Sequence, residues 1–233
     1  MSEIDEVELD PIEEPIPTWD GTTRSVTLTT EGRAVRHALI DSAKAQNWGR
    51  TFSILGQDRH LVNIVRPDGT ARYAVLHHAA YGGASSEVVA RLIALGAWRM
   101  LRNAKGEQPI DIARRRGHSH LLNVLEPVVL HDVSPSTLNE IERHFHALIR
   151  QRANALIEKH SLRLPELETL RELSIPSMWF PVPGMYGGFR FSLEKLCGHD
   201  MLNTSSWCRV VDGSGEEHLI SRFGSLLVDS EFV

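Results

Sequence analysis

The chain has 233 residues, of which 42% are hydrophobic, and 25 basic and 30 acidic side chains give it a net charge of −5. This length is enough for a buried core in one or two domains. No run of 18 apolar residues occurs and the N-terminus is acidic, so we expect neither a membrane-spanning helix nor a secretory signal. The two cysteines make a disulfide framework improbable and favour a reducing, cytoplasmic location.

The charges are unevenly distributed along the chain. Residues 1–20 carry eight acidic and no basic side chains, together with Pro11, Pro15 and Pro17. Because prolines block helix propagation and like charges repel, we expect an acidic, disordered arm over residues 1–20. Residues 33–126 instead hold fourteen Lys or Arg against seven Asp or Glu. This contrast predicts that the arm lies on the basic block as a salt-sensitive latch that competes with an acidic partner.

The first regular elements follow the arm. The threonine-rich stretch 22–30 predicts a short strand. Apolar residues at helical spacing from Val35 to Ala43 then predict a helix, and a second apolar set around Phe52 predicts another short one. These two helices form an atypical first unit of a helical stack.

The segment 75–83 reads VLHHAAYGG, and an apolar pattern at 87–95 predicts a second helix directly after it. The first pattern recurs in degraded form 34 residues later, as PIDIARRRGH at 109–118. Glycine suits the left-handed cap of each first helix, and proline suits the start of the second copy. A period of about 33 residues with this LHxAA motif resembles the ankyrin repeat.

The resemblance implies about three stacked ankyrin units over residues 33–126, with the outer units acting as caps. In this family the histidine at the position of His77 has a structural hydrogen-bonding role, whereas the finger loops and the concave face bind partner proteins. Aromatic and arginine side chains dominate the energetics of such interfaces. The residues expected to contact a partner are Arg72, Tyr73, His78, Tyr81, Trp98, Arg99, Met100, Arg102, Lys105 and Arg115.

The pattern of apolar and turn residues changes after Pro127. Ser134 and Pro135 are typical of a helix start, and an apolar stripe continues to Leu156, so a long helix is predicted. A short helix is expected at 167–173. Alternating segments separated by turn residues predict strands at 178–182, 190–193, 205–211, 217–221 and 225–228, with a hairpin at 212–215. The predicted fold class is α+β, in which the repeat stack precedes a small helix-plus-antiparallel-sheet domain at 131–233.

The C-terminal domain offers a second, alternative site. Its chemistry-bearing residues are Tyr186, Cys208, Arg209, Glu217 and His218. Either cysteine, Cys197 or Cys208, combines on paper with His199 or His218 as a nucleophile and base, but no local signature supports the pairing. The same four residues lack the two close pairs that a zinc site needs, so no metal is predicted.

The pattern as a whole favours a non-enzymatic function without a cofactor. We expect an adaptor that binds a protein partner, one with an acidic surface, through its repeats. Nucleic acid is disfavoured because the chain is acidic overall and contains no nucleic-acid-binding motif. Two alternatives stay open: an enzymatic or small-molecule-binding C-terminal domain to which the repeats recruit the target, and a toxin, immunity or defence component, which is suggested by analogy alone.

Overall fold

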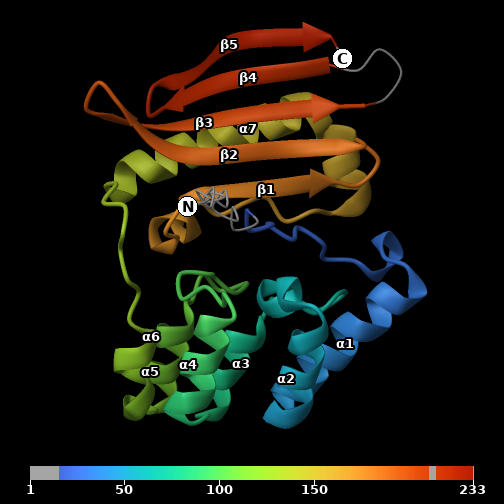
Figure 1. Ribbon diagram of the computed structural model, residues 1–233, viewed down its shortest axis with the longest axis vertical. Helices are drawn as coiled ribbons and strands as arrows, with labels where there is room; N and C mark the ends of the chain where they lie inside the picture. Colours follow the sequence, from blue (N-terminus) through green and yellow to red (C-terminus); the bar gives the residue numbers. More distant parts are fainter. Residues whose placement is uncertain (1–15, 210–213, 233) are drawn as a thin grey trace, which may run out of the picture.

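The computed structural model describes residues 16–209 and 214–232. Helices form the first part of the chain, and a five-stranded antiparallel sheet with one long helix on it forms the last part (Figure 1). The predicted combination of helices with an antiparallel sheet is thereby confirmed. Most of the predicted acidic arm, residues 1–15, lies outside the described residues. No helix in the described ranges is long and apolar enough to cross a membrane.

The elements follow one another in a simple order. The helical elements are η1 (Ser25–Thr27), α1 (Thr30–Lys44), α2 (Trp48–Gln57), η2 (Arg59–Asn63), α3 (Val75–Gly82), α4 (Ser86–Ala94), α5 (Pro109–Arg116), η3 (Ser119–Leu121), α6 (Leu122–Leu125), α7 (Pro135–His160) and η4 (Leu167–Glu172), where η marks a 3-10 helix. The strands are β1 (Ser177–Val182), β2 (Gly187–Leu196), β3 (His199–Cys208), β4 (Ser214–Ser221) and β5 (Gly224–Phe232). The predicted strands at 178–182, 190–193, 217–221 and 225–228 lie within observed ones, and the one at 205–211 overlaps β3 as far as Cys208. Residues 210–213, which hold the end of that predicted strand and the start of the predicted hairpin turn, lie outside the described residues.

The expected strand at 22–30 is wrong. This stretch contains η1 and the start of α1 instead. The hydroxyl of Thr29 accepts a hydrogen bond from the backbone N–H of Gly32, and this capping bond starts α1 at Thr30. Threonine's preference for strands is thus outweighed by its ability to cap a helix.

The helices of the first part pack as antiparallel neighbours around one apolar cluster that includes Leu39, Leu76 and Leu92. His77 is fully buried in it, and its Nδ1 accepts the backbone N–H of Ala74 at 3.2 Å. Because desolvation disfavours a charged imidazole, burial lowers the pKa of His77 to about 3. The side chain therefore has a structural role at the start of α3.

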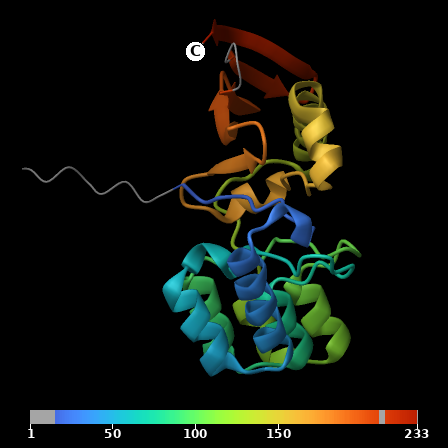
Figure 2. The same cartoon turned by 90° about the vertical axis from the view of Figure 1, so that its right-hand side faces the viewer.

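The sheet is a meander in the order β1-β2-β3-β4-β5, and α7 covers one of its faces (Figures 1 and 2). Side chains alternate between the two faces, so Phe180, Phe189 and Phe191 all point toward α7 and are buried. Phe145 of α7 lies 4.9 Å from the ring of Phe191, centroid to centroid. The opposite face carries Trp179 and other residues that no helix of the described chain covers.

The segment that follows residue 16 joins the two parts. Thr18 forms a parallel bridge with Trp179 of β1, and the segment then passes between the sheet and the helices (Figure 2). Trp19 is buried in the apolar cluster of the C-terminal part, and that cluster also contains Trp98 and Leu101 from the helical part. Residues 16–20, which the sequence assigns to a disordered arm, therefore belong to the folded structure.

Candidate functional site

Four of the predicted partner-binding residues face the chain's own C-terminal part. The loop that contains them, residues 98–102, lies against η4. Glu172 accepts the backbone N–H groups of Arg99 and Met100 at 3.0 and 2.9 Å. Trp98 and Met100 are only 6% and 3% exposed. The side chains of Trp98 and Met100 are therefore packed inside the protein, whereas those of Arg99 and Arg102 stay partly exposed at the edge of this contact.

The side chain of Arg102 is also committed within the chain. Its Nε donates to Glu168 at 2.7 Å, and its backbone N–H donates to Glu166 at 3.2 Å. Arg163 donates to the carbonyl oxygen of Arg102 at 2.6 Å and pairs with Glu166. The basic loop predicted to meet an acidic partner instead meets three glutamates of the same chain, Glu166, Glu168 and Glu172.

Trp19 completes this contact between the two parts. Its ring stacks on Trp98 with centroids 5.8 Å apart and planes within 6° of parallel. Its Nε1 donates to the carbonyl oxygen of Arg163 at 3.0 Å, and the guanidinium of Arg163 lies 5.0 Å from the ring centroid. The sequence analysis missed Trp19; a tryptophan that follows eighteen residues of acidic and proline-rich sequence was the available indication that the chain becomes folded there.

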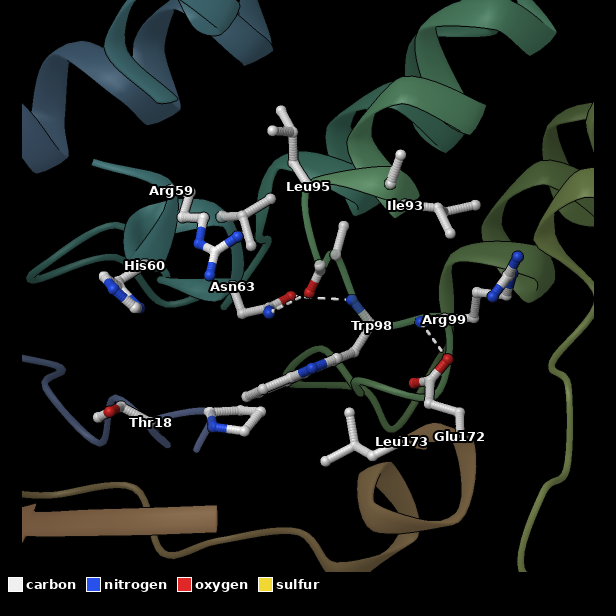
Figure 3. A pocket seen from close by; sticks show the side chains of 15 residues that line it. Thr18, Arg59, His60, Asn63, Ile93, Leu95, Trp98, Arg99, Glu172 and Leu173 are labelled. Carbon is white, nitrogen blue, oxygen red and sulfur yellow. Dashed lines mark hydrogen bonds between the residues drawn. The ribbon is translucent and has the colours of Figure 1, made fainter. Parts of the chain in front are cut away.

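A groove of about 320 Å³ opens beside this contact (Figure 3). Arg59 and His60 lie on one side of Trp98 in that view, and Arg99 and Glu172 lie on the other. Asn63 fixes the wall between them, since its side chain donates to the carbonyl of Gly96 at 2.7 Å and accepts the backbone N–H of Trp98 at 2.9 Å. We call this cavity the Trp98 groove.

A second surface collects the remaining predicted residues on α3, α5 and the loops before them. Tyr73 contacts His78 and Tyr81 edge to face, with centroids 5.3 and 6.2 Å apart. The guanidinium of Arg116 lies 4.5 Å from the centroid of Tyr81. We call the surface formed by Tyr73, His78, Tyr81, Arg115 and Arg116 the Tyr81 patch.

The chemistry of the Tyr81 patch is aromatic and positively charged. Arg115 donates to Glu107 at 2.8 Å, whereas Arg116 forms no ion pair with any described residue. Burial, helped by nearby Lys44, lowers the pKa of His78 to about 4, so His78 is neutral at physiological pH. Arg72 and Lys105, also predicted, are exposed on the two loops before α3 and α5. The backbone N–H of Ala104 donates to the carbonyl oxygen of Ala71 at 3.1 Å and holds these loops together.

The alternative site in the sheet is brought together only in part. Cys208, Arg209 and Glu217 line one cavity of about 450 Å³. His218 faces α7 beneath the sheet, and Tyr186 is 75% exposed in the turn between β1 and β2. The backbone partner of Cys208 is Ser214, four residues before His218, which places the two about 13 Å apart along the sheet. A Cys208–His218 pair is therefore not formed.

No group of three or more His, Cys, Asp or Glu side chains suited to a metal ion occurs within residues 16–209 and 214–232. Cys197 lies in the exposed turn between β2 and β3, whereas Cys208 ends β3 at the other end of the hairpin. The two cysteines therefore lie at opposite ends of the β2–β3 hairpin, too far apart to bind one metal ion together.

No family model and no curated protein matches the chain. Among solved structures, it is similar to a complex of a predatory endopeptidase with an immunity protein from Bdellovibrio bacteriovorus. That match has 24% sequence identity and a TM-score of 0.32, and it covers 37% of this chain and 42% of the other. The chain thus spans less than half of the protein it matches. At this TM-score the likeness supports no conclusion about fold or function, so the function has to be argued from the chain's own geometry.

A half-buried carboxyl group, that of Glu142, lies next to the loop of Arg102 and has a raised pKa. Glu142 of α7 lines a cavity of about 330 Å³ with Glu166 and Glu168, and it accepts the backbone N–H of Leu167 at 2.7 Å. Burial, reinforced by the two neighbouring glutamates, raises the pKa of Glu142 to about 7. Because the folded pKa lies above the unfolded value of 4.5, the folded protein binds this proton more tightly, and stability falls as pH rises from 4.5 to 7.

We therefore expect Glu142→Gln to stabilise the protein at pH 8 by about 1–3 kcal/mol and to have little effect at pH 4.5. Glutamine keeps the oxygen that accepts from Leu167 and removes only the buried charge. Urea unfolding of both proteins at the two pH values measures the difference. Glu140→Gln, an exposed change two residues away on the same helix, is the control. A gain that is equal at both pH values would show that the charge of Glu142 is not the cause.

Proposed function

We propose that the protein is an adaptor that binds a partner protein through the Tyr81 patch, and that its helical part is a short ankyrin stack. The repeat is supported by the matching geometry of α3 and α5. Each has eight residues, and the two begin 34 residues apart, at Val75 and Pro109. Each ends at a left-handed glycine, Gly83 or Gly117.

The two helices also begin alike. In each, the third residue accepts the backbone N–H of the residue before the helix: His77 accepts from Ala74 at 3.2 Å, and Asp111 accepts from Gln108 at 3.0 Å. The same hydrogen bond to the backbone before the helix, made by two different side chains at one repeat interval, supports a common structural unit. Helices α1 and α2 would then form the first unit of the stack.

The observation that carries the adaptor proposal is the position of Tyr81. Tyr81 is 44% exposed, yet its ring is held between Tyr73 and the guanidinium of Arg116. A rigid aromatic group beside an exposed arginine is the combination that contributes most at protein interfaces. Arg114, Arg115 and Arg116 are all exposed, which favours a partner with an acidic surface.

Affinity capture followed by measurement of partner affinity tests the proposal. Tyr81→Ala combined with Arg116→Ala should weaken the complex by at least about 2 kcal/mol, roughly 30-fold in Kd. Arg91→Ala is a matched control, because the guanidinium of Arg91 also lies over an aromatic ring, that of Phe52 in α2, at 4.0 Å from its centroid and outside the Tyr81 patch. An unchanged Kd for the double variant would refute the assignment of the patch.

The alternative of a binding or enzymatic site in the C-terminal part has one supporting observation, the cavity shared by Cys208, Arg209 and Glu217. Arg209→Ala in the same capture experiment separates the two proposals. Loss of the partner in this variant alone would move the site to the sheet. A toxin, immunity or defence role and a cytoplasmic location stay predictions from the sequence.

A further inference from the structure

The Trp98 groove has a basic rim that the adaptor proposal does not use. Arg59 and His60 are exposed on η2 at one side of the groove, and Arg99 lies at the other side (Figure 3). The acidic residue of the lining, Glu172, already accepts the backbone N–H groups of Arg99 and Met100. The groove therefore presents positive charge to whatever occupies it.

Between its basic sides the groove also has several apolar side chains in its mixed lining. Ile93, Leu95, Trp98 and Leu173 contribute the apolar side chains that Figure 3 shows around its centre. An occupant that matches both features needs acidic residues alternating with isolated apolar ones, so that carboxylates meet the rim while apolar side chains meet the interior.

The chain enters its fold through this groove. Pro17 and Thr18, almost the first described residues, are part of the groove lining. The sequence directly before them, residues 8–15, reads ELDPIEEP and contains four acidic residues among Leu9 and Ile12. An extended chain spans about 3.3–3.6 Å per residue, so Glu13 and Glu14 reach at most roughly 10–14 Å from Pro17, which itself lines the groove.

We propose that the Trp98 groove is a docking site for the chain's own acidic segment, residues 8–14. The carboxylates of the segment pair with Arg59, His60 and Arg99, and Ile12 packs against the apolar interior. This inference is independent of the Tyr81 patch. The sequence predicts that the acidic arm contacts the whole basic block of the repeats. The proposal restricts that contact to one groove, on the side where the segment is attached.

The attachment compensates for weak individual contacts. Exposed ion pairs contribute little each, and salt screens them over a Debye length that falls from about 30 Å at 0.01 M to about 10 Å at 0.1 M. A tether of three or four residues, however, gives the segment an effective concentration of about millimolar or more. A segment that would bind only at millimolar concentration as a free peptide therefore occupies the groove when it is attached, and high salt releases it.

Photo-crosslinking in the full chain tests this directly. The photoreactive amino acid p-benzoylphenylalanine replaces the residue at position 12, and mass spectrometry maps the crosslinks at low and high salt. We expect crosslinks to concentrate on residues 59–63 and 93–99 and to fall at least about fivefold at 0.5 M salt. Arg59→Glu with His60→Glu should reduce them to a similar extent, whereas Arg33→Glu, an exposed change on α1, should not.

A charge reversal supplies the decisive comparison. Adding Glu13→Lys and Glu14→Lys to the Arg59→Glu/His60→Glu chain should restore the crosslinks, since the attraction is then re-formed with opposite signs. Restoration supports the proposal. Crosslinks spread over the surface, crosslinks that ignore the charges at positions 59 and 60, or crosslinks between two molecules would each overturn it.

Discussion

Replacing Trp19 by alanine is expected to destabilise the protein by about 3–5 kcal/mol, the usual cost of removing a buried tryptophan. The ring is 1% exposed, stacks on Trp98 and carries the hydrogen bond to the carbonyl of Arg163. The substitution leaves a cavity where the helical part meets the C-terminal part. In a chain of this size the loss corresponds to a fall in Tm of roughly 10 °C, which circular dichroism measures directly.

Trp19→Phe is the informative companion. It keeps an aromatic ring on Trp98 and under Arg163 but removes the Nε1 donor, so a loss of only about 1–2 kcal/mol is expected. If Trp19→Ala cost less than about 1 kcal/mol, the two parts would not depend on this contact. If Trp19→Ala unfolded in two separate steps where the unchanged protein unfolds in one, Trp19 would be the residue that couples the stabilities of the two parts.

Gly188→Ala is expected to have the second large effect, a loss of about 3 kcal/mol or more, or failure to fold. Gly188 lies in β2 opposite Pro181, and a Cβ there would overlap the carbonyl oxygen of Phe180 and press on the ring of Trp179. Trp179 in turn stacks on Trp207 at 4.8 Å on the uncovered face of the sheet. The glycine is required because the backbone of β1 at Phe180 and the ring of Trp179 approach it closely.

Gly56→Ala provides the contrast. Gly56 lies near the end of α2, and a Cβ added to it meets no atom within 4 Å. Alanine forms helix better than glycine, so this variant should gain about 0.5–1 kcal/mol. Urea unfolding of the two variants side by side distinguishes a steric need for glycine at position 188 from the general effect of replacing glycine by alanine. Equal behaviour of the two would contradict the packing around Gly188.

The packing of predicted interface residues against the chain's own C-terminal part has a physical explanation. Trp98, Arg99, Met100 and Arg102 were predicted to bind a partner because tryptophan, arginine and methionine are enriched at the centres of interfaces. Contacts between two parts of one chain use the same chemistry as contacts between proteins. Composition therefore identifies a contact surface at 98–102 correctly but does not reveal that η4 of the same chain covers it.

Local order was predictable where one short stretch of sequence decides it. The cap of α7 at Ser134, the left-handed glycines that end α3 and α5, and the five strands all follow from neighbouring residues. The strand expected at 22–30 failed for a related reason, because Thr29 satisfies a local cap that competes with strand pairing. Element boundaries in the sheet were too short since pairing with a neighbour extends a strand beyond its apolar residues.

The sequence by itself determined the α+β class, the 34-residue spacing of α3 and α5, and the positive charge of the helical part, because periodicity, caps and charge are properties of adjacent residues. Only the tertiary structure decided that Trp19 joins the two parts, that Glu166, Glu168 and Glu172 cover the basic loop, and that Tyr81 and Arg116 remain exposed. These facts depend on contacts between residues far apart in the chain. Their energies come from burial and charge pairing, which no local pattern records.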